Sequence, residues 1–262
     1  MMFLDSLLVI IKTIKFLAFD RPLYRYKTRV RKPRAQFPPI LKEALCCLER
    51  DGFVVIPSYI SPEECRAILD QCLVQIEQSD IRLNKVDTQN GSVRRYLGID
   101  ELISAPEFFG EIIDELARCY LGGRGVRYQS MFEHKIHSFA DEAPAEEPHF
   151  DSWTKRFKAF LYLEDVGHDD GPFVVFSGGK YLNSAWRIVK ELEYVLAGKL
   201  GAHGVLTKHE LSNVLSAGDV VEIPVVGSQG TLILVDTRLI HRGTKVGVGR
   251  ERRMLGSYYD LR

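Results

Sequence analysis

Two short stretches of the chain each carry a histidine and an aspartate two positions apart: "PHFDSW" at residues 148–153 and "GHDDGP" at residues 167–172. In an extended strand, residues i and i+2 point to the same face, so such a pair can hold one metal ion. Glycines enclose the second stretch, and this composition predicts a tight turn in which His168 faces water. The first stretch follows a polar loop and leads into aromatic residues. We therefore expect His149 and Asp151 to be the ligand pair.

A third ligand is indicated further along the chain, where "TLILVDTRLIHRG" reads as an apolar strand that ends at His241. Arg252 then begins another strand, "RRMLGSYY". Two histidines and one carboxylate, with positions left open, suit non-haem Fe(II) in a facial triad. An arginine on a neighbouring strand can hold a carboxylate through two parallel hydrogen bonds. Metal and arginine together suit 2-oxoglutarate, which chelates iron through its keto-acid end, pairs with Arg252 through its far carboxylate and leaves one position for dioxygen.

The rest of the sequence predicts the elements that must position these residues. From residue 126 onward, short runs rich in Val, Ile, Phe and Tyr are separated by Gly, Pro and Asp, as is typical of a sandwich or a double-sheet barrel such as a jelly roll. One helical insert, at about residues 184–197, interrupts them. Helices that precede strands indicate an α+β fold in which the early helices buttress one sheet. The first half predicts a strand at 53–56 and helices at 41–49, at 62–78 behind a capping box of Ser61 and Glu64, and at 106–120.

Composition excludes several classes of protein. The 262 residues include 35 basic and 35 acidic side chains, so net charge gives no reason to expect a nucleic-acid partner. The five cysteines form no Cys-x-x-Cys motif, and their odd number argues against a disulfide framework or a zinc–thiolate site. A reducing, cytoplasmic location is therefore expected.

Residues 1–35 predict an appendage, an amphipathic helix followed by a basic arm, and residues 36–262 predict the folded domain. Apolar residues recur at helical spacing over the first twenty positions, but charged residues interrupt them, so neither a membrane-spanning helix nor a signal peptide fits. Residues 21–34 carry seven basic side chains and no acidic one. Residues 1–34 can therefore make peripheral contact with the inner face of an anionic membrane. Alternatively, the helix packs on its own domain or on a second subunit, and the arm is a solvated linker.

Residues from about 52 to 259 resemble the phytanoyl-CoA dioxygenase family of Fe(II)/2-oxoglutarate-dependent oxygenases. The resemblance is carried by "DGFVVIPSYISPEEC", "HFD", "FKAFLYLEDVGHDDGPFVVFSGGK" and "GTLILVDTRLIHRGTKVGVGRERRMLGSYY". It implies a cupin-like double-stranded β-helix as the core, in agreement with the jelly roll indicated above. It also implies the roles of five residues: the catalytic metal ligands His149, Asp151 and His241, the cosubstrate-binding Arg252, and Gln129 at the keto-acid end of the cosubstrate.

The sequence departs from the family pattern at a few positions. Arg250, Arg252 and Arg253 lie close together, and alternation along a strand allows only one of the last two to point inward. We expect Arg252 to be that residue. Gly243 stands where the family often has a small hydroxyl residue, two positions after the distal histidine. Lys158 lies on the strand after the His-x-Asp motif, where we expect a solvated edge lysine.

The expected activity is the hydroxylation of an aliphatic C–H bond in a small organic or lipid-linked substrate, with oxidative decarboxylation of 2-oxoglutarate to succinate and CO2. The presence of Asp151 favours hydroxylation or desaturation, because related halogenases lack this carboxylate. The second hypothesis is a non-enzymatic, membrane-peripheral binding module on the same barrel. Fold alone does not distinguish the two hypotheses, because function depends on the site.

Overall fold

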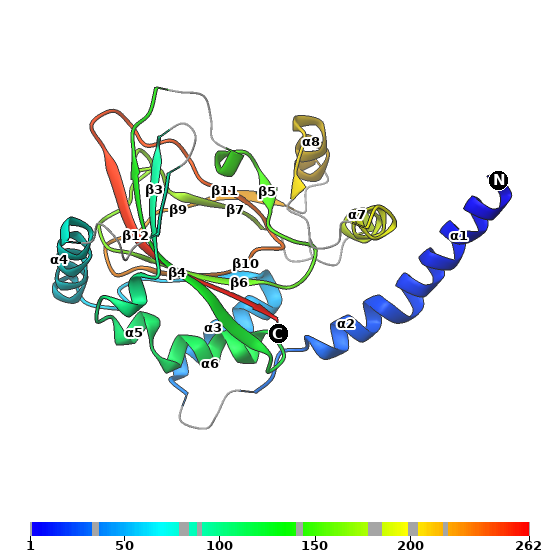
Figure 1. The fold of residues 1–262 in the computed structure, drawn as a ribbon, viewed down its shortest axis with the longest axis horizontal. Helices are drawn as coiled ribbons and strands as arrows, with labels where there is room; N and C mark the ends of the chain where they lie inside the picture. The colour runs from blue at the N-terminus through cyan, green and yellow to red at the C-terminus, as the bar shows by residue number, and fades with distance from the viewer. Residues whose placement is uncertain are drawn as a thin grey trace.

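Two antiparallel sheets face each other and enclose the interior of the molecule, with helices outside them (Figure 1). The larger sheet has the strand order β1-β10-β6-β12-β4-β3-β2, and the smaller has β8-β5-β11-β7-β9. The computed structural model describes residues 2–32, 37–78, 84–87, 91–139, 144–177, 185–198, 204–216 and 220–261. The strands are β1 (Phe53–Ile56), β2 (Asn84–Asp87), β3 (Val93–Leu97), β4 (Gly125–Ile136), β5 (His149–Phe150), β6 (Phe157–Tyr162), β7 (Phe173–Ser177), β8 (Gly204–Val205), β9 (Val221–Val225), β10 (Leu232–Asp236), β11 (Ile240–Arg242) and β12 (Glu251–Leu261).

The two faces of the larger sheet have different partners, and β10 illustrates the alternation. Leu232 and Leu234 belong to a buried cluster that includes side chains of the outer helices α3 (Pro39–Asp51) and α6 (Glu111–Tyr120). Ile233 and Val235 belong to a second cluster, which fills the space between the two sheets. Side chains of a strand alternate between its faces, so one apolar strand serves both clusters. The expected α+β fold, a jelly roll buttressed by N-terminal helices, is confirmed.

Local signals in the first half are confirmed with one exception. β1 has the predicted bounds, and α4 (Pro62–Gln78) begins behind the capping box, where Glu64 N–H donates to Ser61 Oγ and Ser61 N–H donates to the Glu64 carboxylate. The prediction of a single helix at 106–120 is wrong. Gly110 divides it into α5 (Pro106–Phe109) and α6, because its backbone is extended and a Cβ there would lie 2.0 Å from the Pro106 carbonyl oxygen.

The apolar strand expected to end at His241 is two strands, β10 and β11, in different sheets. β10 ends at Asp236, whose carboxylate accepts hydrogen bonds from the backbone N–H of Arg238 at 3.0 Å and from its guanidinium at 2.6 Å. Leu239 N–H donates to the Asp236 carbonyl at 3.0 Å, and Tyr120 Oη donates to the buried carboxylate at 2.5 Å. These bonds fix the turn that carries the chain to His241 in the smaller sheet.

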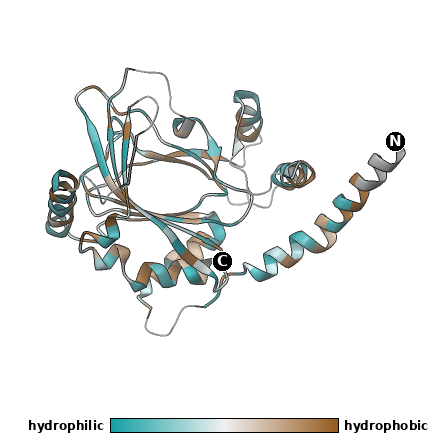
Figure 2. Cartoon of the chain, in the orientation of Figure 1, coloured by the Kyte–Doolittle hydropathy of each residue, from teal (hydrophilic) through white to brown (hydrophobic). Residues whose placement is uncertain are grey.

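The N-terminal segment is helical over a longer stretch than expected. α1 (Met2–Lys15), the π-helical turn η1 (Phe16–Asp20) and α2 (Arg21–Lys27) follow one another without a break, so the first part of the basic arm is helix. α1 extends away from the body of the molecule (Figure 1), and apolar residues recur along it (Figure 2). Within the described part of the chain, no helix has the length and apolar character needed to cross a membrane.

Two stretches with weak sequence signals contain further elements. β2 and β3 extend one edge of the larger sheet. The helical insert is confirmed as α7 (Ala185–Leu196), which contacts α1. The remaining elements are α8 (Lys208–Ser216) and the 3₁₀ turns η2 (Ile99–Glu101) and η3 (Pro144–Glu146).

Candidate active site

His149 and His241 are direct partners across two short strands. β5 consists of His149 and Phe150, and His149 pairs in antiparallel register with His241 of β11. Cross-strand partners hold their Cβ atoms about 4.5–5.5 Å apart, and the two imidazole ring centres lie 4.4 Å apart. Asp151 follows β5, with Oδ1 3.9 Å from Nε2 of His149 and 3.6 Å from Nε2 of His241. The three residues can each offer one ligand atom within 4.8 Å of the others.

Backbone hydrogen bonds orient both imidazole rings. Nδ1 of His149 lies 2.7 Å from the Glu147 carbonyl, and Nδ1 of His241 lies 2.9 Å from the Leu239 carbonyl. A carbonyl oxygen only accepts, so each neutral ring carries its proton on Nδ1 and presents the lone pair of Nε2. Two imidazole lone pairs and one carboxylate oxygen therefore converge, and this donor set fits a divalent transition metal.

Lys158 is not the solvated edge residue that we expected. Its side chain is 15% exposed, and Nζ lies 2.6 Å from Oδ2 of Asp151 and 4.2 Å from the centre of the Tyr258 ring. Burial raises the pKa of the Asp151 carboxyl, but the Lys158 ammonium and His241 outweigh burial and hold the pKa well below its ordinary value. Asp151 is therefore ionised at neutral pH, with Oδ2 held by Lys158 and Oδ1 near both imidazoles.

The two histidines open onto a cavity of about 70 Å³ between the sheets. Of the three clustered arginines, Arg252 lines this cavity and is buried, whereas Arg253 pairs with Glu164 at 2.6 Å and Arg250 is largely exposed. The side chains of Arg252 and Arg253 thus point to opposite faces of β12, as alternation along a strand requires. The cavity combines ionisable side chains with apolar and aromatic ones, among them Arg95, Glu133, Lys135, Glu146, Lys158, Phe160, Phe173, Met254 and Tyr258.

Arg252 has a carboxylate partner that sequence reasoning missed. Glu133 on β4 lies between two arginines, 2.6 Å from Arg252 and 2.8 Å from Arg95 on β3. Burial raises the pKa of the Glu133 carboxyl, but the guanidinium groups of Arg95 and Arg252 outweigh burial and lower the pKa to about 2. Arg252 also donates to the Gly171 carbonyl, while its buried Nε has no hydrogen-bond partner among the described residues. Arg252 therefore retains a donor for a second carboxylate.

The other residues singled out from the sequence lie around this centre. Gln129 is on β4 opposite Tyr258, and it is not among the described residues that line the cavity. Gly243 does line the cavity, and a Cβ there would lie 3.2 Å from Nζ of Lys135, so a lysine occupies the space beside this glycine. His168 is exposed, in a turn where Gly167 N–H donates to the Asp170 carboxylate, as the glycine-rich sequence predicted.

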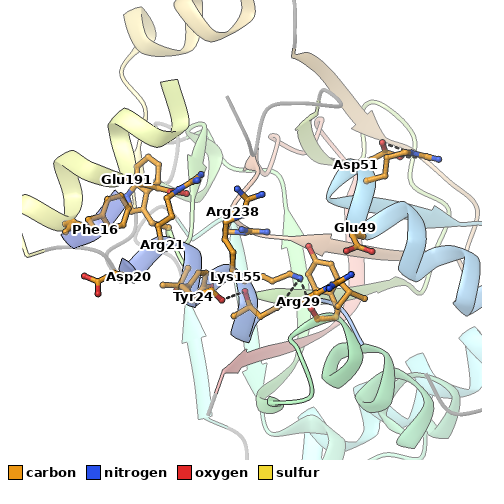
Figure 3. Close-up of a pocket in the computed structure, with 18 of the residues that line it drawn as sticks. Phe16, Asp20, Arg21, Tyr24, Arg29, Glu49, Asp51, Lys155, Glu191 and Arg238 are labelled. Carbon is orange, nitrogen blue, oxygen red and sulfur yellow. Dashed lines mark hydrogen bonds and ion pairs between the residues drawn. The ribbon is translucent and has the colours of Figure 1, made fainter. Parts of the chain in front are cut away.

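A larger cavity, of about 590 Å³, lies between the N-terminal helix and the barrel (Figure 3). The backbone N–H of Lys155 donates to Tyr24 Oη, and its Nζ donates to the carbonyls of Thr28 at 3.2 Å and Tyr120 at 2.7 Å. Burial and the nearby Arg238 lower the pKa of Lys155 to about 7. None of the three candidate metal ligands lines this cavity. This cavity is therefore separate from the candidate metal site.

The barrel, the His-x-Asp and distal histidine cluster and the buried arginine beside it define the class of Fe(II)/2-oxoglutarate-dependent oxygenases. The family follows from the sequence: the model of the Phytanoyl-CoA dioxygenase (PhyH) family matches residues 48–254. The chain belongs to this family, so the resemblance noted in the sequence is confirmed. No protein of curated function matches the chain significantly in sequence.

Solved structures share the fold at low sequence identity. EctD from S. alaskensis with bound Fe has a TM-score of 0.63 and 16% identity, over 89% of this chain and 81% of that chain. The epimerase SnoN in complex with Fe3+, alpha ketoglutarate and nogalamycin RO has a TM-score of 0.59 and 14% identity, over 85% and 84%. HygX from Streptomyces hygroscopicus with nickel, 2-oxoglutarate and hygromycin B has a TM-score of 0.56 and 16% identity, over 84% and 87%.

Glu133→Gln is expected to lower the free energy of unfolding by about 3–5 kcal/mol at pH 7, because it leaves the buried guanidinium of Arg252, and the partly exposed one of Arg95, without their carboxylate. The folded pKa of about 2 lies below the ordinary value of 4.5, so ionised Glu133 stabilises the fold fully above about pH 4.5. This stabilisation is lost as the pH falls toward 2. Urea unfolding of both proteins between pH 7 and pH 3 should therefore show a difference that shrinks on acidification.

Glu164→Gln is the matched control. Glu164 also pairs with an arginine of β12, but its side chain is 31% exposed. Exposed pairs contribute about 0–1 kcal/mol, so this variant should stay within that range of the wild type. A Glu133→Gln variant as stable as Glu164→Gln at pH 7 would contradict the role given to Glu133.

Proposed function

We propose that this protein is a dioxygenase that uses Fe(II) and 2-oxoglutarate to hydroxylate an aliphatic C–H bond of a small organic or lipid-linked substrate. The observation that carries the proposal is the convergence of the ligand atoms of His149, Asp151 and His241 within 4.8 Å, at the cavity that Arg252 also lines. Family membership supports it, and so do the iron and 2-oxoglutarate named for the similar structures.

Each residue of the site has a proposed role. His149 and His241 would hold the metal through Nε2 and Asp151 through Oδ1, while Lys158 keeps Oδ2 occupied and the carboxylate ionised. Arg252 would bind the far carboxylate of 2-oxoglutarate through its unpartnered Nε–H and the edge that now meets Glu133. Gln129 would contact the keto-acid end. The bound metal would supply the activation of dioxygen, coupled to the decarboxylation of 2-oxoglutarate to succinate and CO2.

The walls of the cavity support an aliphatic substrate. Phe160, Phe173 and Met254 place apolar surface beside the candidate metal ligands, and the cavity is small and buried between the sheets. These three side chains would hold the reacting carbon by apolar contact, while the ionisable residues of the same cavity leave polar partners for 2-oxoglutarate. Asp151 also favours hydroxylation, because its carboxylate fills the position that a halide would need.

The alternative is a non-enzymatic, membrane-peripheral binding module on the same barrel. Such a module would bind metal or 2-oxoglutarate without turning the cosubstrate over. The discriminating measurement is succinate release, which a binding module does not produce. A complete ligand set favours the enzyme, because no member of the triad is replaced by a residue that cannot bind metal.

His149→Ala and His241→Ala should each reduce succinate release to background while thermal unfolding stays cooperative, because two remaining ligands hold Fe(II) poorly. The assay contains Fe(II), 2-oxoglutarate, ascorbate and a panel of acyl, amino-acid and sugar compounds. His168→Ala is the matched control, since this histidine belongs to the other His-x-Asp stretch and is exposed. Normal turnover in either ligand variant would remove the proposed function, and lost turnover in the control would remove its assignment to these histidines.

Arg252→Ala should raise the KM for 2-oxoglutarate by about 30-fold or more, because truncating one partner of a buried charge pair costs about 2–5 kcal/mol. Arg252→Lys keeps the positive charge, so it tests whether unfolding of the Arg252→Ala variant explains the higher KM. Arg253→Ala is the control, and its KM should change by less than about threefold. The assignment is reversed if Arg253→Ala shows the large increase and Arg252→Ala does not.

We also propose that the N-terminal helix holds this enzyme on the inner, cytoplasmic face of an anionic membrane. Exposed apolar side chains follow the helix, including Ile10 at 53%, Ile14 at 56% and Phe19 at 66%. The basic residues from Lys12 to Arg34 add attraction to anionic lipid, at about 1 kcal/mol for each basic residue near the surface. Exposed apolar surface and adjacent positive charge together favour a membrane over an uncharged protein partner.

The double variant Ile10→Asp and Ile14→Asp should bind vesicles containing phosphatidylglycerol at least about tenfold more weakly than wild type, because each lost isoleucine is worth about 1.5–3 kcal/mol. Val248→Asp is the control, since Val248 is 76% exposed but lies between β11 and β12. Flotation of all three proteins measures binding. Equal flotation of wild type and the double variant would exclude the helix as the membrane contact.

A further inference from the structure

The segment that carries two of the candidate metal ligands is supported from behind by one buried arginine. His149 and Asp151 offer their ligand atoms to the same cluster, while Phe150 and Trp153 lie against Arg187 of α7. The Arg187 guanidinium carbon is 4.0 Å from the centre of the Trp153 ring and 5.1 Å from that of Phe150. The guanidinium also donates to the carbonyl of Ser152 at 3.5 Å. The residues next to the candidate ligands therefore pack against a buried guanidinium.

The same arginine reaches the segment that carries the third ligand. Arg187 Nη1 donates to the carbonyl of Arg238 at 2.9 Å. Arg238 precedes Leu239, whose carbonyl accepts the Nδ1–H of His241. Arg187 is fully buried, with 0% of its surface exposed. One side chain therefore ties together the connection after β5, which carries Asp151, and the connection before β11; His149 and His241 lie on the two strands that these connections adjoin.

Arg187 is linked in turn to the N-terminal helix. The carboxylate of Glu191, one turn further along α7, lies 3.3 Å from Nε of Arg187 through Oε1 and 2.8 Å from Nε of Arg21 on α2 through Oε2. Figure 3 shows Arg21 beside Glu191 at one end of the large cavity, with Tyr24 and Lys155 further along it. The Arg21–Glu191 pair thus joins α2 to α7 at this end of the cavity.

We propose that Arg187 is a positioning residue for the metal triad, and that Glu191 connects it to the N-terminal helix. This inference rests on the proposed function, because it assumes that the triad binds metal. Arg187 touches no ligand atom. It fixes the backbone on the far side of both ligand-bearing connections, so that the two Nε2 atoms and the Asp151 carboxylate are already converged when a metal arrives. Groups that orient ligands in this way change metal affinity by about 10–100-fold when they are removed.

A buried arginine also stabilises a fold, so the test needs a control arginine whose substitution removes a similar set of contacts. Arg127 on β4 has the same kinds of partner: carboxylates of Asp100 and Asp114 at 3.2 Å, the carbonyl of Phe109, and the Phe109 ring at 5.5 Å. It lies on the side of the larger sheet that faces α6, and it contacts neither ligand-bearing connection. Arg127→Met therefore removes a comparable set of contacts away from the triad.

The experiment is calorimetric titration of the full chain with Co(II) alone, for wild type, Arg187→Met and Arg127→Met, with thermal unfolding recorded for each. We expect Arg187→Met to raise the Kd for Co(II) by about 10–100-fold, and Arg127→Met to raise it by less than about threefold, at similar losses of Tm. Arg187→Lys, which keeps the charge but has fewer directed donors, should fall between wild type and Arg187→Met. Arg21→Met should raise the Kd for Co(II) by a smaller factor than Arg187→Met does.

A Kd in Arg187→Met that lies within threefold of the Arg127→Met value would overturn the positioning role. If Arg187→Met does not fold, Arg187→Lys and Glu191→Gln decide by the same comparison, with Co(II) affinity unchanged from wild type as the contrary result. A wild-type protein that binds no Co(II) would instead remove the proposed function, so the two failures are distinguishable.

Discussion

The cross-strand pairing of His149 with His241 is the contact on which the site depends. Strands of two and three residues contribute few hydrogen bonds of their own, so neighbours must hold them. Each strand has one: β8 pairs with β5 at His149, and β7 pairs with β11 at His241. The four strands form a continuous ladder through the smaller sheet. Ligands that lie far apart in the chain are therefore brought together by an ordinary sheet register, and the backbone bonds to their Nδ1 atoms then aim both rings.

The sequence predicted the clustering of the candidate ligands better than it predicted the backbone that brings them together. The i, i+2 spacing of His149 and Asp151, and alternation at Arg252 and Arg253, are local properties of a strand, and local patterns are readable. The turn at Asp236 is different, because apolar residues on both sides of Asp236, Thr237 and Arg238 make the run from 231 to 241 resemble one strand. What breaks it is a buried carboxylate that meets Arg238 and the distant Tyr120, a contact that exists only in the folded chain.

The charges of Lys158 and Glu133 explain why the sequence did not mark these two residues as part of the site. Lys158 and Glu133 carry the charges that a surface residue would carry, and nothing in their immediate sequence marks them as buried. Their burial is tolerable only because each meets a partner from another part of the chain, Lys158 with Asp151 and Glu133 with Arg95 and Arg252. A buried charge without such a partner would be too costly. The part of the interior beside the candidate metal site therefore contains several ion pairs next to the apolar cluster, and the sequence alone gives the charges without their pairing.

The N-terminal helix packs against the rest of the protein on one side and keeps an exposed apolar surface on the other. Its inner side is anchored by buried Phe16, by Arg21 at Glu191 and by Tyr24 at Lys155, and the last two contacts reach α7 and the connection that follows Asp151. Its outer side leaves Ile10 and Ile14 exposed. Packing on its own domain, one of the alternatives that the sequence left open, therefore occupies the inner side and leaves the outer side free for the proposed membrane contact. One of the inner contacts leads from Arg21 through Glu191 to Arg187, the buried arginine behind the candidate metal ligands.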